Sequence, residues 1–239
     1  MKPSATAVQR QVRALGSRER ATHSLRFFKT GPGEYGEGDR FLGLTVPMLR
    51  MLAREHQDLP IKEVTRLLQS PWHEERLLAL LILVRQYARG TPATRAAIHR
   101  LYLKNTKHIN NWDLVDSSAE CIVGAHLAHR DRSLLARLAR SNDLWERRIA
   151  IIATFHFIKR GEFRPTFNIA QLLLDDEHDL IHKATGWMLR EVGQRDRKAE
   201  LKFLDRYSHR MPRTMLRYAI ERFPPQKRRE WLARSVTTK

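Results

Sequence analysis

The sequence has a single cysteine, Cys121, among its 239 residues. One cysteine excludes an intrachain disulfide and a zinc site built from cysteines, and it fits a reducing compartment such as the cytoplasm. Long hydrophobic runs are also missing, since the longest, Leu77 to Val84, is too short to cross a bilayer. Residues Met1 to Gly16 form an amphipathic pattern with arginines and do not resemble a signal peptide. We therefore expect a cytoplasmic protein that is neither exported nor bound to a membrane.

Acidic residues are few relative to basic ones. Lys and Arg together number 44 and Asp and Glu 26, which gives a formal net charge of +18. Such a surplus predicts a polyanionic partner, either DNA, RNA or an anionic membrane surface, and does not choose among them. With 42% hydrophobic residues, the chain is long enough to bury a core, as one domain or as two.

No stretch alternates apolar and polar residues over a useful length, so we predict no β-sheet. Apolar residues recur instead at helical spacing after turn and capping residues. The predicted helix starts are Thr45 with Pro47, Pro60, Ser70 with Pro71, Thr91 with Pro92, and Pro165. Four of the 11 glycines fall between Gly31 and Gly38, so we expect a loop there. The segment has no GxxxxGKS or GxxxxGKT order and no preceding strand, which excludes a phosphate-binding loop.

Three segments resemble one another and indicate an internal repeat: Pro71 to Ala79, Leu144 to Ala150 and, more weakly, Leu180 to Ala184. Their spacing fits a unit of about 36 residues with one copy skipped. A period of roughly 35 to 45 residues built from two helices is typical of HEAT-like and related solenoids. We therefore predict an all-α fold, a curved HEAT-like solenoid of antiparallel helix pairs with a concave basic groove, forming one domain over residues 1–239.

The repeat places four residues at equivalent positions of successive inner helices: Arg76, Trp112, Arg148 and Lys183. We expect these residues to line one concave wall of the solenoid. For each basic residue taken alone, the alternative is the solvated end of an amphipathic helix.

Near the middle of the chain, Trp112 and Asp116 lie four residues apart in a predicted helix that runs on through Ala119 to Ala128. An aromatic ring and a carboxylate on one helix face suit a cation. The alternative is an ordinary helix start, with Asn110 or Asn111 as the cap and the tryptophan in the core.

Other candidate chemistry is weaker. His178 and His182 lie four residues apart but without an HExxH pattern, so we predict no metal site. Ser117 and Ser118 lack the sequence context of a nucleophile elbow, and Cys121 lies in an apolar stretch typical of a buried, inert thiol.

Several segments together resemble the AlkD family of DNA alkylation repair glycosylases over nearly the whole chain. They are Phe41 to Leu44 with Pro47 and Arg50, Trp112 to Ser117, Trp145 to Arg148, and Lys183 to Glu191. The resemblance implies a HEAT-like enzyme that hydrolyses the N-glycosidic bond of cationic alkylpurines, such as 3-methyladenine and 7-methylguanine, in double-stranded DNA. It also implies an abasic product for base excision repair and no cofactor. We expect a monomer that is associated with the bacterial nucleoid in use.

The same resemblance assigns roles to residues. Trp112, Asp116 and Trp187 match the catalytic cleft of the family, and Arg148 matches its basic DNA-contacting residue. We expect four further DNA contacts: Lys183, Arg76, Arg190 and Thr45. The family is similar in gripping the duplex backbone along the concave surface, with the lesion left in or near the base stack.

Two questions stay open at this point. The loop from Gly31 to Gly38 is longer than the connection expected there, so Thr45 and the pair Phe27 and Phe28 are either DNA contacts or ordinary cap and core residues. The alternative function is a non-catalytic HEAT-like module that binds DNA or RNA through its basic groove. A protein-binding scaffold would leave the net charge and the Trp-Asp pair unexplained.

Overall fold

A computed structural model describes residues 3–234 of the chain. Over these residues the chain forms helices joined by turns and loops, and its extended segments form only an isolated β-bridge between Arg40 and Trp72. Neighbouring helices pack against one another, as in a helical-repeat fold. The predicted all-α fold is therefore confirmed. In this part of the chain no helix is long and apolar enough to cross a membrane.

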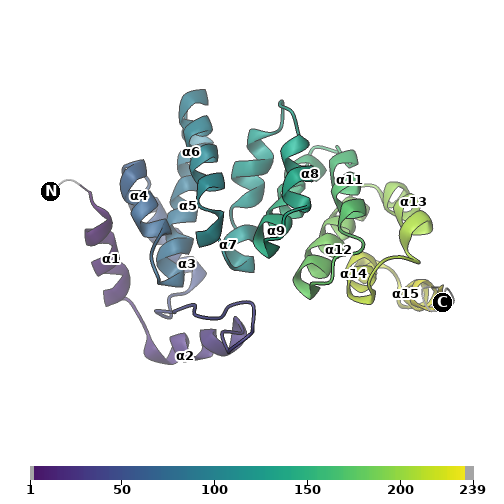
Figure 1. Cartoon of the computed structure of the whole chain (residues 1–239), viewed down its shortest axis with the longest axis horizontal. Helices are drawn as coiled ribbons and strands as arrows, with labels where there is room; N and C mark the ends of the chain where they lie inside the picture. The colour runs from purple at the N-terminus through teal and green to yellow at the C-terminus, as the bar shows by residue number, and fades with distance from the viewer. Residues whose placement is uncertain (1–2, 235–239) are drawn as a thin grey trace. The chain divides into compact units, whose positions relative to one another are not determined.

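The chain divides into two compact units, residues 1–122 and 123–239. Figure 1 labels the helices of both units. Unit 1 is organised around α5 (His73–Arg89), which packs against α3, α4, α6 and α7. The other elements of unit 1 are α1 (Ala5–Ala14), α2 (Arg18–Phe27), α3 (Val46–Glu55), α4 (Ile61–Leu68), α6 (Pro92–Lys104), the 3-10 helix η1 (Thr106–His108) and α7 (Trp112–Asp116). The single domain predicted over residues 1–239 stays a prediction.

Unit 2 is organised around α12 (Asp179–Gly193), which packs against α9, α11, α13 and α14. The other elements of unit 2 are α8 (Ser133–Ala139), α9 (Leu144–Ala153), α10 (Phe155–Ile158), α11 (Arg164–Leu172), α13 (Arg197–Tyr207), α14 (Arg213–Ala219), the 3-10 helix η3 (Ile220–Arg222) and α15 (Pro225–Arg234). A π-helical turn, η2 (Glu120–Gly124), lies at the boundary of the two units.

The predicted helix starts agree with the structure to within about two residues. Thr45 is the N-cap of α3 and Thr91 that of α6, each with a proline in the first turn that follows. α4 begins directly after Pro60, and α11 carries Pro165 in its first turn. α5 begins two residues after Pro71, because the hydroxyl of Ser70 holds the Trp72 amide in a turn first (3.1 Å).

The first turn of α5 carries four consecutive polar residues that are all buried: His73, Glu74, Glu75 and Arg76. The carboxylate of Glu74 accepts the backbone N–H groups of residues 42, 43 and 44, at 2.8, 2.7 and 3.3 Å. Glu75 accepts hydrogen bonds from Gln9 and Arg13 of α1, both at 2.8 Å. A helix N-terminus favours such acids. Here they also tie α1 and the segment before α3 to α5.

Gly43, in the segment that Glu74 binds, has to be a glycine. Its φ is +81°, and an added Cβ would lie 2.2 Å from the carbonyl oxygen of Ser17 and 2.7 Å from the amide nitrogen of Ala21. The Gly43 carbonyl in turn accepts a hydrogen bond from Arg20 Nε at 2.7 Å. The absence of a side chain therefore lets the backbone before α3 approach α2 closely.

The helix predicted to continue from Trp112 through Ala128 is interrupted, and that prediction is wrong in its length. α7 ends at Asp116, and the chain turns before the π-helical residues Glu120–Gly124. The hydroxyl of Ser118 donates to the carbonyl of Leu114 at 2.6 Å, which competes with continuous helical bonding. By contrast, the loop expected between Gly31 and Gly38 is confirmed.

Candidate active site

Trp112 and Asp116 are the first and last residues of α7, and both are half-buried. Asn111 caps the helix, since its Oδ1 accepts the Trp112 N–H at 2.8 Å. Leu114 and Val115, between Trp112 and Asp116, are fully buried in the core of unit 1. A carboxylate and an indole on one short helix are thus both partly exposed, and their sharing of one face stays a prediction.

Trp112 belongs to an aromatic cluster of five side chains from four segments of unit 1: Phe27, Phe28, Phe41, His73 and Trp112. The Phe28 ring stacks on Trp112 with centroids 5.3 Å apart and planes 21° apart, and it lies 4.9 Å from both Phe41 and His73. Phe41 and His73 stack on each other at 4.5 Å. Phe27 meets Trp112 edge-on at 5.8 Å and is 57% exposed. The cluster thus runs from the interior of unit 1 to its surface.

Beneath the aromatic cluster lies a buried network of ionisable groups. Nδ1 of His73 lies 2.8 Å from Asp39 Oδ2, and Nε2 of the same ring lies 2.8 Å from Asp113 Oδ2. The other oxygen of Asp39 accepts a hydrogen bond from Arg76 at 2.7 Å. Asn111, the cap of α7, also reaches Asp39 at 3.3 Å. We call the first three residues the Asp39–His73–Asp113 triad.

Contacts within the triad shift the pKa values of His73 and Asp39. Burial by itself lowers the pKa of His73, but the carboxylates of Asp113 and Asp39 outweigh burial and raise the pKa to about 9. For Asp39, burial raises the pKa, whereas the hydrogen bond and charge of His73 and then the Arg76 guanidinium lower it, with a net shift below the ordinary value. At neutral pH His73 is therefore an imidazolium, and it lies between Asp39 and Asp113.

The far end of α7 rests on Tyr102. The Tyr102 hydroxyl and the Ser118 hydroxyl are 3.0 Å apart, and both side chains are buried. Burial, together with the charges of Asp116 and Cys121, raises the pKa of Tyr102. The phenol is therefore neutral and holds the turn that follows Asp116. Neither it nor Ser118 has a partner that would make it a nucleophile.

The third predicted catalytic residue, Trp187, lies in unit 2 on α12 and is half-buried. Its indole N–H donates to Glu191 Oε1 at 3.1 Å, one turn further along the same helix. Its ring centroid lies 6.1 Å from that of Phe155, over which Lys159 and Arg195 place their charges at 4.5 and 5.6 Å. This surrounding of cations suits a polyanion near Trp187.

Gly186 sets how closely α12 packs beside Trp187. An added Cβ at Gly186 would lie 2.4 Å from the carbonyl oxygen of Met215 and 2.5 Å from Cβ of Tyr218, both in α14. A glycine at this helical position therefore allows the backbones of α12 and α14 to make direct contact. The sequence motif included Gly186, but the sequence alone did not show that close packing on α14 requires a glycine there.

Arg76 is buried and does not present its charge to solvent, and its contact with DNA stays a prediction. It is 4% exposed, and its guanidinium donates to Asp39 and to the Ser70 carbonyl oxygen. Charged residues are rarely buried unless they are paired. Here Asp39, distant in the sequence, supplies the pair.

Arg148 is also buried, at 5% exposure, and donates to the carbonyl oxygen of Leu180 at 2.6 Å. Lys183 is part-exposed and pairs with Asp179 at 2.7 Å, one turn earlier on α12. Arg190 is mostly buried and pairs with Glu221. These three residues lie in unit 2, and their contact with DNA stays a prediction.

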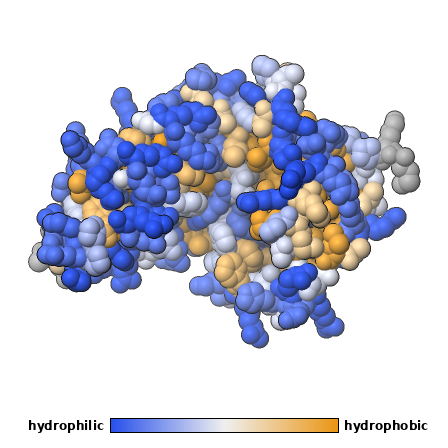
Figure 2. Space-filling view, turned by 180° about the vertical axis from the view of Figure 1, so that it is seen from behind, coloured by the Kyte–Doolittle hydropathy of each residue, from blue (hydrophilic) through white to orange (hydrophobic). Residues whose placement is uncertain are grey.

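In unit 1, Thr45 is exposed, and its side chain makes no hydrogen bond as the cap of α3, so its hydroxyl faces solvent. Phe27 is exposed between the cations Arg26 and Lys29, which are exposed too. Figure 2 shows a surface that is mostly hydrophilic, with hydrophobic patches between the hydrophilic residues. The aromatic pair Phe27 and Phe28 was the sequence signal for this part of the surface, and sequence reasoning missed the two cations.

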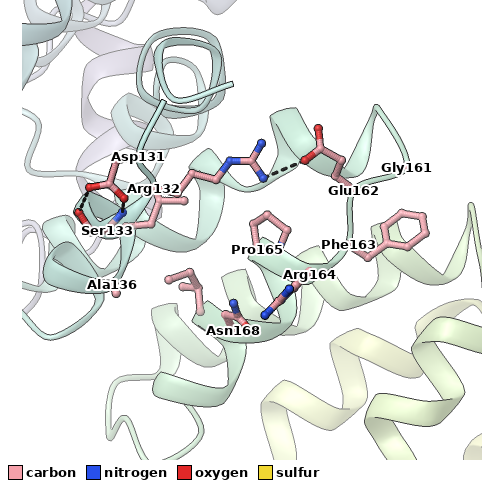
Figure 3. Close-up of a pocket in the computed structure, with 12 residues that line it drawn as sticks. Asp131, Arg132, Ser133, Ala136, Gly161, Glu162, Phe163, Arg164, Pro165 and Asn168 are labelled. Atoms are coloured by element: carbon pink, nitrogen blue, oxygen red, sulfur yellow. Dashed lines mark hydrogen bonds and ion pairs between the residues drawn. The ribbon is translucent and has the colours of Figure 1, made fainter. Parts of the chain in front are cut away.

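The open cavity drawn in Figure 3 lies in unit 2 between α8 and α11. Three of its charged groups have partners: Arg132 pairs with Glu162 at 2.8 Å, and Asp131 accepts the Ser133 N–H at 3.0 Å. It contains neither a histidine nor a cysteine. Within residues 3–234 no group of three or more His, Cys, Asp or Glu side chains is arranged to hold a metal ion. The chemistry of the molecule is therefore better sought at α7.

The family model of DNA alkylation repair enzymes matches residues 8–223. Among solved structures, the chain is similar to a protein described as a predicted DNA alkylation repair enzyme from Enterococcus faecalis, with a TM-score of 0.67 and 16% identity, over 88% of this chain and 97% of that one. At this identity the likeness concerns the fold. No curated protein gave a significant match.

Proposed function

The chain belongs to the DNA alkylation repair enzyme family, and from this premise we propose that it is a monofunctional DNA glycosylase. Its substrates are N3- and N7-alkylated purines in duplex DNA, such as 3-methyladenine and 7-methylguanine. It hydrolyses their N-glycosidic bond and leaves an abasic site for base excision repair. The observation that carries the proposal is Asp116 beside Trp112 on α7, a carboxylate and an indole that reach the surface together in a chain of net charge +18.

The charge of the substrate explains why a carboxylate and tryptophans suffice. An alkylated N3 or N7 makes the purine cationic, so the base leaves as a neutral molecule and needs no general acid. Positive charge develops on the deoxyribose as the bond breaks, and Asp116 stabilises it and orients the attacking water. An ion contact of this kind at ~4 Å contributes about 4 kcal/mol at an effective dielectric of ~20, roughly a thousandfold in rate.

Trp112 and Trp187 contribute through their ring faces. A cation over an indole gains about 0.5 to 2 kcal/mol. Stacking of Phe28 on one side of Trp112 fixes the plane of its ring. Because the reaction uses only water, the proposed enzyme needs no cofactor, and it acts as a monomer in the cytoplasm, on nucleoid DNA.

The proposed DNA contacts are Arg148, Lys183, Arg190 and Thr45, and we add to them Arg26, Phe27 and Lys29, which are exposed. Arginines and lysines bind phosphates without regard to sequence. Binding should therefore weaken steeply as salt is raised, because each phosphate contact releases about one counterion from the DNA.

The test is release of free base from a duplex that contains 7-methylguanine. We expect release well above the spontaneous rate, and Asp116→Asn should slow it about a thousandfold while the Kd for DNA changes little. Asp205→Asn is the matched control, because Asp205 is exposed in α13 of unit 2. Tight binding without release would refute the glycosylase and support the non-catalytic DNA-binding module. Full activity of Asp116→Asn would refute the role given to Asp116.

A further inference from the structure

α7 carries two carboxylates, and the structure gives them different surroundings. Asp113 is mostly buried, with a side chain that is 13% exposed and one oxygen 2.8 Å from His73 Nε2. Asp116, one turn later, is half-buried and ends the helix. The two acids are close enough in sequence to lie on neighbouring faces of one turn, so an unpaired Asp113 would place a second negative charge beside the first.

α7 is too short to keep its shape by itself. Isolated helices shorter than about 12 residues are marginal in water, and α7 has five. Its first turn is held from outside by two bonds, from Asn111 to Asp39 and from Asp113 to His73. Both bonds lead to the same buried pair, Asp39 and His73. The placement of α7 therefore depends on that pair.

His73 is also joined to Trp112 through the aromatic cluster. Its ring lies 4.9 Å from Phe28, and Phe28 stacks on Trp112. A ring whose two nitrogens each face a carboxylate oxygen at 2.8 Å satisfies both only when both nitrogens carry a proton. The charged groups around it are Asp39 from the segment before α3, Asp113 from α7 and, on α5 itself, Arg76, which binds the far oxygen of Asp39.

We infer that His73 is a positioning residue of the proposed glycosylase: its imidazolium neutralises Asp113 and fixes α7, so that Trp112 and Asp116 face the cationic nucleotide. The inference rests on the proposed function and adds a division of roles between the two acids. Asp113 binds His73 and so positions α7, whereas Asp116 stabilises the charge that develops on the substrate. His73 touches neither the substrate nor the water, so its effect is exerted through α7.

A double-mutant cycle tests this division. His73→Gln removes the positive charge and should slow single-turnover base release about 10- to 100-fold, the effect of a small displacement of a reacting group, with the Kd for DNA within about twofold of wild type. Because the lost charge served to neutralise Asp113, the double variant His73→Gln/Asp113→Asn should regain most of that loss. His209→Gln, an exposed histidine in unit 2, is the matched control and should release base at the wild-type rate.

The outcomes separate the inference from the proposed function. Folded His73→Gln with the wild-type rate, or no regain of rate in the double variant, would overturn the inference while the glycosylase proposal stands. If the wild-type protein releases no base, the glycosylase proposal fails by itself. A 15N NMR spectrum that resolves the histidines then still tests whether His73 is an imidazolium bound to Asp113. The same spectrum tests the inference if His73→Gln does not fold. We expect both ring nitrogens of His73 to be protonated at pH 7. A neutral ring at that pH would overturn the inference that His73 neutralises Asp113.

Discussion

Trp112 lies on a helix of five residues in unit 1, whereas Trp187 lies on a helix of 15 residues in unit 2. The indole of Trp187 is bonded within its own helix, to Glu191, and Gly186 beside it lets α12 pack directly on α14. Trp112 is held by side chains from distant segments, among them Phe28 and the triad through Asp113. One tryptophan is placed by local structure and close helix packing, and the other by tertiary contacts that must all form together.

The largest expected effects test how each tryptophan is supported. Gly43→Ala should destabilise unit 1 by about 3 kcal/mol or more, since it combines backbone strain with a clash, and Gly186→Ala should destabilise unit 2 by about 2 kcal/mol through the clash alone. Urea unfolding followed by tryptophan fluorescence measures both. Gly33→Ala is the control, because Gly33 has a φ of +76° with no atom within 4 Å of an added Cβ. Unchanged stability of Gly186→Ala would contradict the close packing of α12 on α14.

Replacing the tryptophans themselves should have an intermediate effect. Trp112→Phe and Trp187→Phe keep an aromatic ring but weaken its attraction for a cation, so each should slow base release by roughly 2- to 30-fold. Single-turnover rates on 7-methylguanine duplex measure this, with Trp231→Phe in α15 as the control. The two variants should differ in stability, because only Trp112 is stacked in the aromatic cluster. Equal rates for wild type and Trp112→Phe would argue against a role of the Trp112 ring in catalysis.

The smallest expected effect compares the buried ionisable groups of the two units. Both ring nitrogens of His73 in unit 1 face a carboxylate. Glu200 in unit 2 is fully buried, and its Oε2 accepts a hydrogen bond from Arg197 whereas its Oε1 has no hydrogen-bond partner. Burial raises the pKa of Glu200 to about 8, although Arg197 opposes the shift. An acid with a raised pKa contributes stability that is complete below its unfolded value of 4.5 and is lost as pH rises toward 8.

Glu200→Gln should therefore flatten the decline of Tm between pH 5 and 8 and raise Tm at pH 8 by about 2 to 4 °C, for a gain of about 1 kcal/mol. Thermal unfolding over this pH range measures it, with exposed Glu177→Gln as the control. The contribution of His73 has the same sign but a later window. It is complete below pH 6.5 and is lost as pH rises through about 9. A decline of the same size in Glu200→Gln and in wild type would show that Glu200 is charged in the folded protein.

The sequence predicted the local structure well because its causes are local. Thr45 with Pro47 and Thr91 with Pro92 are helix starts by their own chemistry, and the glycines between residues 31 and 38 can only form turns. The pairing of Trp112 and Asp116 on α7 followed from their spacing. The early end of α7 did not, because it depends on the Ser118 hydroxyl and its partner Tyr102.

The contacts that hold α7 could not be predicted from the sequence. Asp39, His73 and Asp113 are more than 30 residues apart from one another, and no spacing rule brings them together. The same is true of Arg76, whose burial depends on Asp39. A charged residue in a sequence is expected to be exposed to solvent, and only the fold shows which charged residues are buried with a partner.

The buried first turn of α5 also determines where the chain tolerates insertions and deletions. Adding or removing one residue there would rotate the positions that follow by about 100°, and Glu74, Glu75 and Arg76 would leave their partners at once. The loop at residues 31–38 has no such register, because its turns are closed mainly by its own residues. Homologous chains should therefore vary in length at this loop and keep a constant length from Ser70 through α5.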